Sequence, residues 1–452
     1  MTTRPPKSRT PRSSAKAPKA TEPTDAAPPP ARRRSRRATP DVEDGVVERE
    51  AAHTWRWKAS FRRHAFGWKS QPPITRIKEA VSEIQKIGKK QPMLAAEGAV
   101  AFLERVSPAL ERVDSSSGAI GSAVRRTIED LVPLIANAPA DPKTRDAWLD
   151  RLFTAYQDDA IPYIESLGDH WGELCASKEV ASAWADRLVD GTKLAWSPDP
   201  KSLSFFKGCV PCLGALVRAE RYDEVLALLE HAPKIWHFRM YGVKALAAQG
   251  KKAEAIRYAE DGRWAGDHPA RIARACEGIL LSSGLVEEAY RRYGLVANQG
   301  GTYLATFRAV AKKYPHKHAG EILADLVATT PGDEGKWFAA AKEAGLFEEA
   351  LALARRTPCD PKTLTRAARD FGETQPAFAE GAGLLALHWI ARGYGFDLTG
   401  MDVVDAYRAT LSAAARRGES EDAKARIRAV IAQGYGPALQ FVQKVLGREL
   451  GL

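Results

Sequence analysis

Two short patterns of cysteine and histidine are the first candidates for chemistry in this sequence. Cys209 and Cys212 have the spacing of a redox pair or of half a zinc site. A redox pair needs a βαβ setting and a zinc site needs a second ligand pair, and neither is visible. We therefore interpret both cysteines as small buried apolar side chains. His316 and His318 are two residues apart, so on a helix they would point apart and make a weak ligand pair.

The other histidines give no catalytic pattern. His170, near Glu173, and His388, beside Trp389, lie in apolar segments, where local hydrogen bonds are expected to satisfy them. No phosphate-binding P-loop, dinucleotide fingerprint, nucleophile elbow or HExxH motif occurs. We predict no catalytic, cofactor-binding or metal-binding residues, and an enzyme with its site in residues 74–200 is only the third hypothesis.

The first 45 residues have the composition of a disordered basic tail. Residues 1–40 hold nine prolines and 11 lysines and arginines against two acids, so they carry nine of the 11 net positive charges of the 452-residue chain. Such a segment has too little apolar surface to offset the entropy of ordering. Its densest part could contact polyphosphate, and a merely solubilising tether is an equal alternative. The residues concerned are Arg32, Arg33, Arg34, Arg36 and Arg37.

A connecting segment, residues 46–73, interleaves aromatic and basic side chains. Rings beside cations suit single-stranded nucleic acid. The alternative is an aromatic clasp that packs on the first helices, and we favour it because buried aromatic rings contribute large apolar areas. The candidate nucleic-acid contacts in this segment are Trp55, Arg56, Trp57, Lys58, Arg62 and Arg63.

Helical periodicity begins near residue 74 and continues to the end of the chain. The apolar spacing and turn residues predict helices over 74–89, 92–113, 119–136, 142–158, 163–175 and 178–193. No segment alternates as a strand does, so we expect an all-α protein. Residues 74–200 form either degenerate repeats or a separate helical region, and the sequence leaves both open.

A short phrase recurs in the second half. Nearly literal copies start at Gly250, Gly284 and Gly345, each with alanine five residues later; weaker marks fall at Glu220, Tyr314, Gly372 and Gly418. Glycine permits the left-handed turn that ends a helix, the acids that follow suit a helix N-terminus, and a small residue lets two helices approach. A period near 30 residues is typical of stacked helical hairpins.

The phrase resembles the second half of the tetratricopeptide (TPR) consensus, which has glycine, four residues and then alanine. The resemblance covers about 200 residues, and the Trp/Leu-Gly signature of the first helix is missing. It implies an α-solenoid of stacked antiparallel helix pairs over residues 201–452, closed by a C-terminal helix, with the first helices lining a concave face.

Five positions that precede each mark lie on one face of the first helix, and we call this face the stripe. These 35 positions hold 13 bases and only three acids. The surplus predicts a basic groove for an acidic ligand, with a merely solvated charged face as the alternative. The candidate groove residues are Lys244, Arg271, Arg274, Arg308, Lys312, Lys342, Arg366, Arg369 and Arg408, with Lys207, Arg218, Lys362 and Arg416 on the same stripe.

These patterns favour a non-catalytic scaffold that holds an acidic protein or peptide segment. The alternative is a DNA- or RNA-binding protein that uses the tail, the aromatic-basic segment and the groove together. No apolar run is long enough for a membrane span. Five cysteines and no secretory signal predict a reducing, cytoplasmic setting. The sequence does not determine the oligomeric state.

Overall fold

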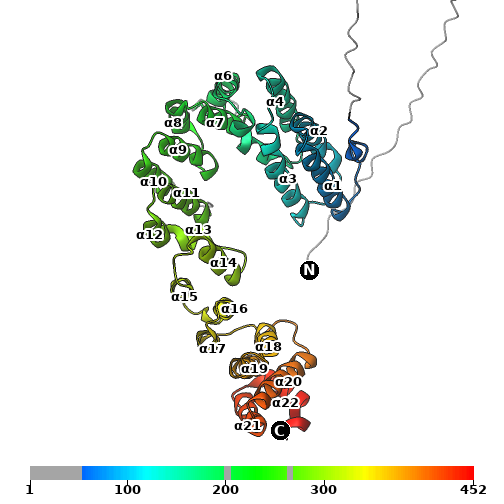
Figure 1. Cartoon of the computed structure of the whole chain (residues 1–452), viewed down its shortest axis with the longest axis vertical. Coiled ribbons are helices and arrows are strands. Elements are labelled where there is room, and N and C mark those ends of the chain that lie inside the picture. Colours follow the sequence, from blue (N-terminus) through cyan, green and yellow to red (C-terminus); the bar gives the residue numbers. More distant parts are fainter. Residues whose placement is uncertain (1–52, 198–204, 262–267, 452) are drawn as a thin grey trace, which may run out of the picture. The chain divides into compact units, whose positions relative to one another are not determined.

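The protein is all-α, as the sequence predicts. A computed structural model describes residues 53–197, 205–261 and 268–451, and every regular element in these ranges is a helix (Figure 1). The tail expected over residues 1–45 lies outside the described residues.

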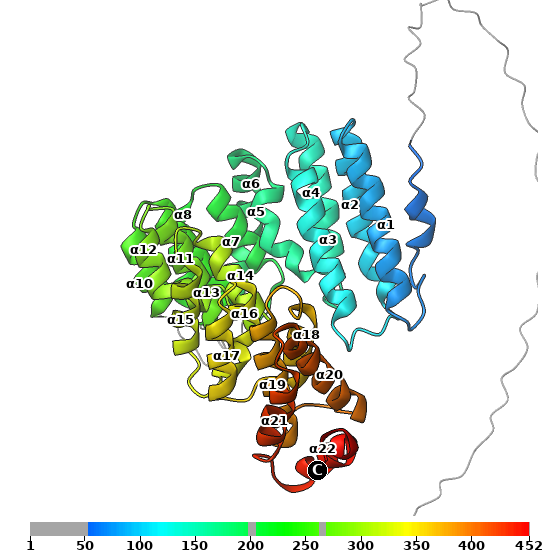
Figure 2. The ribbon, with the colours of Figure 1, turned by 60° about the horizontal axis from the view of Figure 1, so that its bottom comes forward.

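In residues 53–197, six α-helices and two 3-10 helices precede a series of helix pairs. The first four α-helices lie side by side (Figure 2), and the boundaries of α3 are those that the apolar spacing predicts. These elements are η1 (Arg56–Ser60), α1 (Gln71–Gly88), α2 (Pro92–Leu110), α3 (Ala119–Ala136), α4 (Pro142–Gln157), η2 (Glu165–His170), α5 (Trp171–Leu174) and α6 (Lys178–Ala195).

The single helix predicted over residues 163–175 is wrong. The chain instead forms the 3-10 helix η2 and then the single turn α5. Two glycines explain the difference, because each allows a close approach that a side chain would block. A Cβ atom on Gly172 would lie 2.3 Å from the carbonyl oxygen of Gly214, and one on Gly168 would lie 2.8 Å from the hydroxyl of Tyr156.

Helix pairs follow, and in each pair we name the two members the first and second helix. Neighbouring first helices contact each other, as α7 does with α9 and α18 with α20. The pairs are α7 (Cys209–Arg218) with α8 (Tyr222–His231), α9 (Trp236–Ala248) with α10 (Lys252–Glu260), α11 (Pro269–Leu281) with α12 to α13, α14 (Tyr303–Lys313) with α15 (Ala319–Ala328), α16 (Phe338–Glu343, preceded by η4, Glu334–Trp337) with α17 (Phe347–Arg356), α18 (Pro361–Asp370) with α19 (Pro376–Ala391), and α20 (Gly400–Arg416) with α21 (Ser420–Ile431); α22 (Gly436–Leu450) is last.

The turn between paired helices adopts one conformation at five of the seven predicted marks. At Gly284, for example, the N–H donates to the carbonyl of Leu281, and the N–H of Leu285 donates to that of Leu280, both at 3.0 Å. This is the Schellman motif, which closes the last carbonyls of a helix around a left-handed residue. The five positive φ angles run from 61° to 79°, at Glu220, Gly250, Gly284, Gly345 and Gly418.

The small residue five positions after each of these turns is fully buried, as predicted: Val225, Ala255, Ala289, Ala350 and Ala423. The two remaining marks are wrong. Tyr314 has a φ of −122°, and its ring fills the space between helices. Gly372 also lacks a positive φ. The alanine five residues later, Ala377, is exposed, and its neighbour Phe378 is buried instead.

The second helix after Gly284 contains a π-helical turn that the sequence did not predict. Tyrosine hydroxyls from this region reach carboxylates on neighbouring elements: Tyr293 donates to Glu260 at 2.7 Å, Tyr290 to Asp325 at 2.7 Å and Tyr314 to the buried Glu277 at 2.6 Å. Burial is the largest cause of the raised pKa of all three tyrosines. The helix consists of α12 (Val286–Ala289), the π turn (Tyr290–Gly294) and α13 (Leu295–Ala297).

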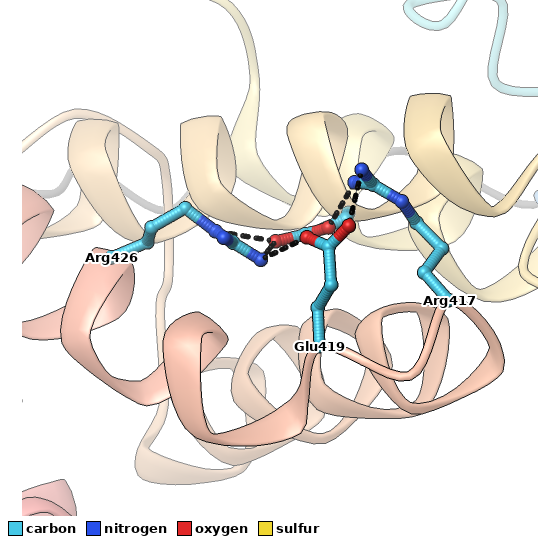
Figure 3. A network of polar contacts seen from close by, with 4 residues as sticks. Arg417, Glu419 and Arg426 are labelled. Carbon is cyan, nitrogen blue, oxygen red and sulfur yellow. Dashed lines mark hydrogen bonds and ion pairs between the residues drawn. The ribbon is translucent and has the colours of Figure 1, made fainter.

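A buried carboxylate joins the last pairs (Figure 3). Glu380 of α19 is 2% exposed and accepts hydrogen bonds from Arg417 at 2.6 Å and from Arg426 at 2.8 Å. Glu419 bridges the same two guanidinium groups, at 2.8 and 3.0 Å. Because Arg417 and Glu419 flank the left-handed Gly418, the network fixes the turn between α20 and α21 against α19.

We predict opposite effects of two glycine substitutions in one helix pair. Gly284→Ala should lower the free energy of unfolding by about 1–2 kcal/mol, since a Cβ is disfavoured in the left-handed region. Gly278→Ala, at an open position inside α11, should raise it by about 0.5–1 kcal/mol. Urea unfolding followed by circular dichroism would measure both. Equal effects at the two sites would contradict the role of the turn.

We also predict that Glu380→Ala is strongly destabilising. It leaves two guanidinium groups without their buried partner, which costs about 3 kcal/mol. Hydrogen exchange of the amides of α19 to α21 would measure the local loss. The control is Glu373→Ala, which removes an exposed pair with Arg416 and should cost less than about 1 kcal/mol. Comparable exchange in both variants would show that the network adds little.

Candidate binding site

The aromatic segment packs on the first helices as a clasp. Trp55, Trp57 and Phe61 are buried, and the rings of Trp57 and Phe61 meet Phe102 of α2 edge-on, at centroid distances of 5.2 and 4.9 Å. Gly98 of α2 makes room for Trp55, because a Cβ atom there would lie 2.2 Å from the indole ring. This burial fits the clasp interpretation.

The cations of the clasp stay in water while its rings do not. Arg56, Lys58, Arg62 and Arg63 are exposed, and Arg63 forms an ion pair with Glu111 at 3.3 Å. The buried faces of Trp55 and Trp57 cannot stack on a base in this structure. Contact between the cations and nucleic acid stays a prediction. The tail residues predicted for the same role, Arg32, Arg33, Arg34, Arg36 and Arg37, lie outside the described residues.

The cysteines and histidines form no recognisable reactive centre. Cys209 and Cys212 are buried free thiols, and burial raises their pKa to about 11 and about 12. His316 lies 2.8 Å from Glu287, where it belongs to a surface ion pair with that residue. Within the described ranges, no three metal-ligating side chains lie together.

Buried thiols with a raised pKa should react slowly. We predict that iodoacetamide leaves Cys209 and Cys212 of the native protein unmodified near neutral pH, because the thiolate is the nucleophile. Both should alkylate after denaturation, which serves as the control. Peptide mass spectrometry would locate the modification. Rapid labelling of either cysteine in the native protein would contradict the buried, apolar role.

The predicted basic stripe brings residues of neighbouring first helices together. Arg308 of α14 donates to Glu343 of α16 at 2.6 Å, and both positions belong to the stripe. Further along, the ammonium of Lys342 lies 5.5 Å from the ring centroid of Phe371, at the end of α18. The ammonium of Lys362 in α18 lies 3.9 Å from Asp402 of α20. At these three places a stripe side chain contacts the next first helix or its end.

Several stripe cations cap the C-termini of helices. Lys207 donates to the carbonyls of Tyr156, Gln157 and Asp159 at the end of α4, and Arg274 donates to that of Ala297 at 2.8 Å. Such contacts stabilise the negative end of a helix. Lys207 and Arg274 therefore have a structural role as helix caps. The sequence alone did not distinguish this role from ligand binding.

Most of the nine candidate groove residues have no carboxylate partner in the described part of the chain. Arg308 pairs with Glu343, and Arg369 pairs with Asp370 at 2.9 Å. The other seven form no such ion pair: Lys244, Arg271, Arg274, Lys312, Lys342, Arg366 and Arg408.

Five of the stripe cations line a groove of about 1000 Å³ between α18 and α20. They are Lys362, Arg366, Arg369, Arg408 and Arg416. Five acids line the same groove: Asp360, Asp370, Glu373, Asp402 and Asp405. The groove is thus closer to neutral than the stripe predicts, because helix-cap and turn positions, which the stripe omits, supply three of these acids.

A larger cleft, of about 1370 Å³, lies among η2, α5, α7, α9 and α11. Lys244 and Arg271, from successive first helices, line it together with Lys207 and Arg218. Its walls also carry large apolar side chains, including Phe205 and Ile235, which are 77% and 45% exposed. The cleft thus combines charged side chains with exposed aromatic surface in a concave site, as ligand pockets usually do.

Three polar side chains define the inner part of this cleft. Oδ1 of Asp169, in η2, lies 3.3 Å from Nε2 of His237, at the start of α9. Tyr241 follows one turn after His237, and burial together with the charge of Asp169 raises its pKa. Lys244 is solvent-exposed at the rim, but desolvation by the walls lowers its pKa, an effect that Asp169 opposes.

Sequence reasoning missed Asp169 and Tyr241. Tyr241 lies three residues before Lys244, so the first-helix periodicity could have placed the two side by side. Asp169 gave no signal, because it falls in the segment wrongly predicted as one regular helix.

Comparison with known proteins adds no identity. No protein-family model matches the chain, and no curated protein matches it significantly. In the described part of the chain, no helix combines the length and apolar character that crossing a membrane requires.

Proposed function

We propose that this protein is a non-catalytic binding or scaffold protein of TPR-like helix pairs arranged as an α-solenoid. In the proposed role, the first helices hold an acidic segment of a protein partner in a reducing, intracellular setting. The observation that supports this is the set of seven first-helix cations that have no carboxylate partner among the described residues. Cations left without an internal counter-charge favour an acidic ligand.

The arrangement of first helices supports an extended ligand. It draws on the contacts of Arg308 with Glu343, Lys342 with Phe371 and Lys362 with Asp402, each of which joins a stripe residue to the next first helix or its end. An extended segment could therefore meet several stripe cations in turn. Each exposed pair contributes little by itself, so binding would depend on the number of pairs formed.

We predict that Lys312→Glu, Arg366→Glu and Arg408→Glu together weaken binding of a fluorescein-labelled oligoglutamate peptide. Three lost attractions, at about 0.5–1 kcal/mol each, give at least a tenfold loss of affinity. Fluorescence anisotropy would measure it. These residues are chosen because none forms an ion pair with another described residue, so the fold should be unaffected.

The matched control is Arg257→Glu, Arg291→Glu and Arg355→Glu, which changes the net charge equally at exposed positions of second helices. It should change affinity less than about threefold. Equal loss in both variants would indicate bulk charge alone. Unchanged binding in the first-helix variant would exclude this face as the site.

Exposed cations on the clasp support nucleic acid as a second candidate ligand. Arg56, Lys58 and Arg62 form no ion pair with a described residue. If the chain binds nucleic acid through them, a single-stranded oligonucleotide should bind with affinity that falls steeply with salt. Charge reversal at these three residues should abolish that binding and leave the oligoglutamate complex intact.

A further inference from the structure

Two polar atoms in the large cleft are buried without a hydrogen-bond partner among the described residues. They are the hydroxyl oxygen of Tyr241, a residue that is 1% exposed, and Oδ1 of Asp169, whose 3.3 Å ion-pair contact with Nε2 of His237 does not have hydrogen-bond geometry. Native proteins pair nearly all such atoms, and each exception calls for an explanation. Since both residues line the cleft, a bound ligand could supply the missing partners.

The chemistry of these atoms determines which hydrogen-bond donors and acceptors the ligand must carry. The carboxylate oxygen of Asp169 accepts only, so it needs a donor. Burial raises the pKa of Tyr241, so its hydroxyl keeps the proton and can donate to an acceptor. The ammonium of Lys244, exposed at the rim and 4.9 Å from the centroid of the Tyr241 ring, can donate to an acceptor as well.

The charges of the cleft disfavour a ligand of either sign. Five basic residues and six acidic residues line it, with Glu165, Asp169 and Glu173 on η2 and α5 and with Lys244 and Arg271 on α9 and α11. An ion attracted by one wall is repelled by the other. A neutral group that both donates and accepts a hydrogen bond fits best.

We propose that the cleft binds the backbone of an extended protein segment, with one peptide N–H donated to Asp169 and a peptide carbonyl accepted from Tyr241 and Lys244. This rests on the proposed function and names how the same first-helix face holds its partner. The exposed Phe205 and Ile235 at the cleft suit the side chains of such a segment. Recognition of the backbone would anchor the partner, and the first-helix cations outside the cleft would select acidic sequences.

Tyr241→Phe tests the proposal because its two effects differ in sign. It removes a buried hydroxyl that has no hydrogen-bond partner within the described ranges, so the melting temperature should stay the same or rise. It also removes a donor to the bound peptide, so affinity should fall about fivefold to tenfold. The control is Tyr156→Phe in the same cleft. The Tyr156 hydroxyl already donates to the carbonyl of Lys207 at 3.2 Å, so this change should lower the melting temperature and leave affinity unchanged.

The probe is a blocked tetra-alanine peptide, which carries peptide units and no charge, titrated into the full-length protein by calorimetry. A version methylated on its backbone nitrogens lacks the donors and should not bind. Acetate and methylammonium test for an anion or a cation site. Failure of the blocked peptide, equal binding of the methylated peptide, preferred binding of either ion, or undiminished binding to Tyr241→Phe would each overturn the proposal.

The neutral probe also separates this proposal from the one before it. If oligoglutamate binds at the first-helix cations and the blocked peptide does not bind, the backbone site alone is wrong. If the blocked peptide binds and charge reversal leaves oligoglutamate unaffected, the acidic-ligand proposal alone is wrong.

Discussion

The left-handed turn between paired helices is the constraint on which the rest of this structure depends. At Gly250, Gly284, Gly345 and Gly418 it ends one helix, closes that helix's last carbonyls and starts the next after one residue. The short connection leaves the second helix little rotational freedom, so the residue five positions later always faces its partner helix. The same constraint, counted backwards, sets which side chains of the first helix face outward. One backbone conformation thus fixes both the core contact and the candidate binding face.

Local patterns in the sequence therefore predicted the all-α class and most of the turns between paired helices. The boundaries of α3 and the five Schellman turns follow from apolar spacing and from residues that cap or end helices. The departures occur where a distant segment decides the outcome. The backbone of Gly172 approaches Gly214, which shortens the helix expected there, and the ring of Tyr314 takes the place of a small residue. Contacts between segments that are distant in the sequence cannot be predicted from local patterns.

The candidate site shows the same division. The stripe of cations came from counting along single helices, and the structure places those positions on adjacent first helices. The acids at the edges of the α18 and α20 groove come from caps and turns, such as Asp360 and Asp402, so a count confined to one helix face omitted them. Asp169 and Tyr241 matter because of what surrounds them, since the absence of a partner for a buried atom is a property of the folded chain alone.

The tyrosines around the π turn connect neighbouring elements differently from the arginines near the C-terminus. Tyr290, Tyr293 and Tyr314 are neutral donors to carboxylates on three separate elements. Salt screens interactions between charges, including those of exposed guanidinium groups, far more than it weakens a hydrogen bond donated by a neutral tyrosine hydroxyl. These three hydroxyl contacts should therefore persist at salt concentrations that weaken the ion pairs beside them, such as that between Arg292 and Glu260.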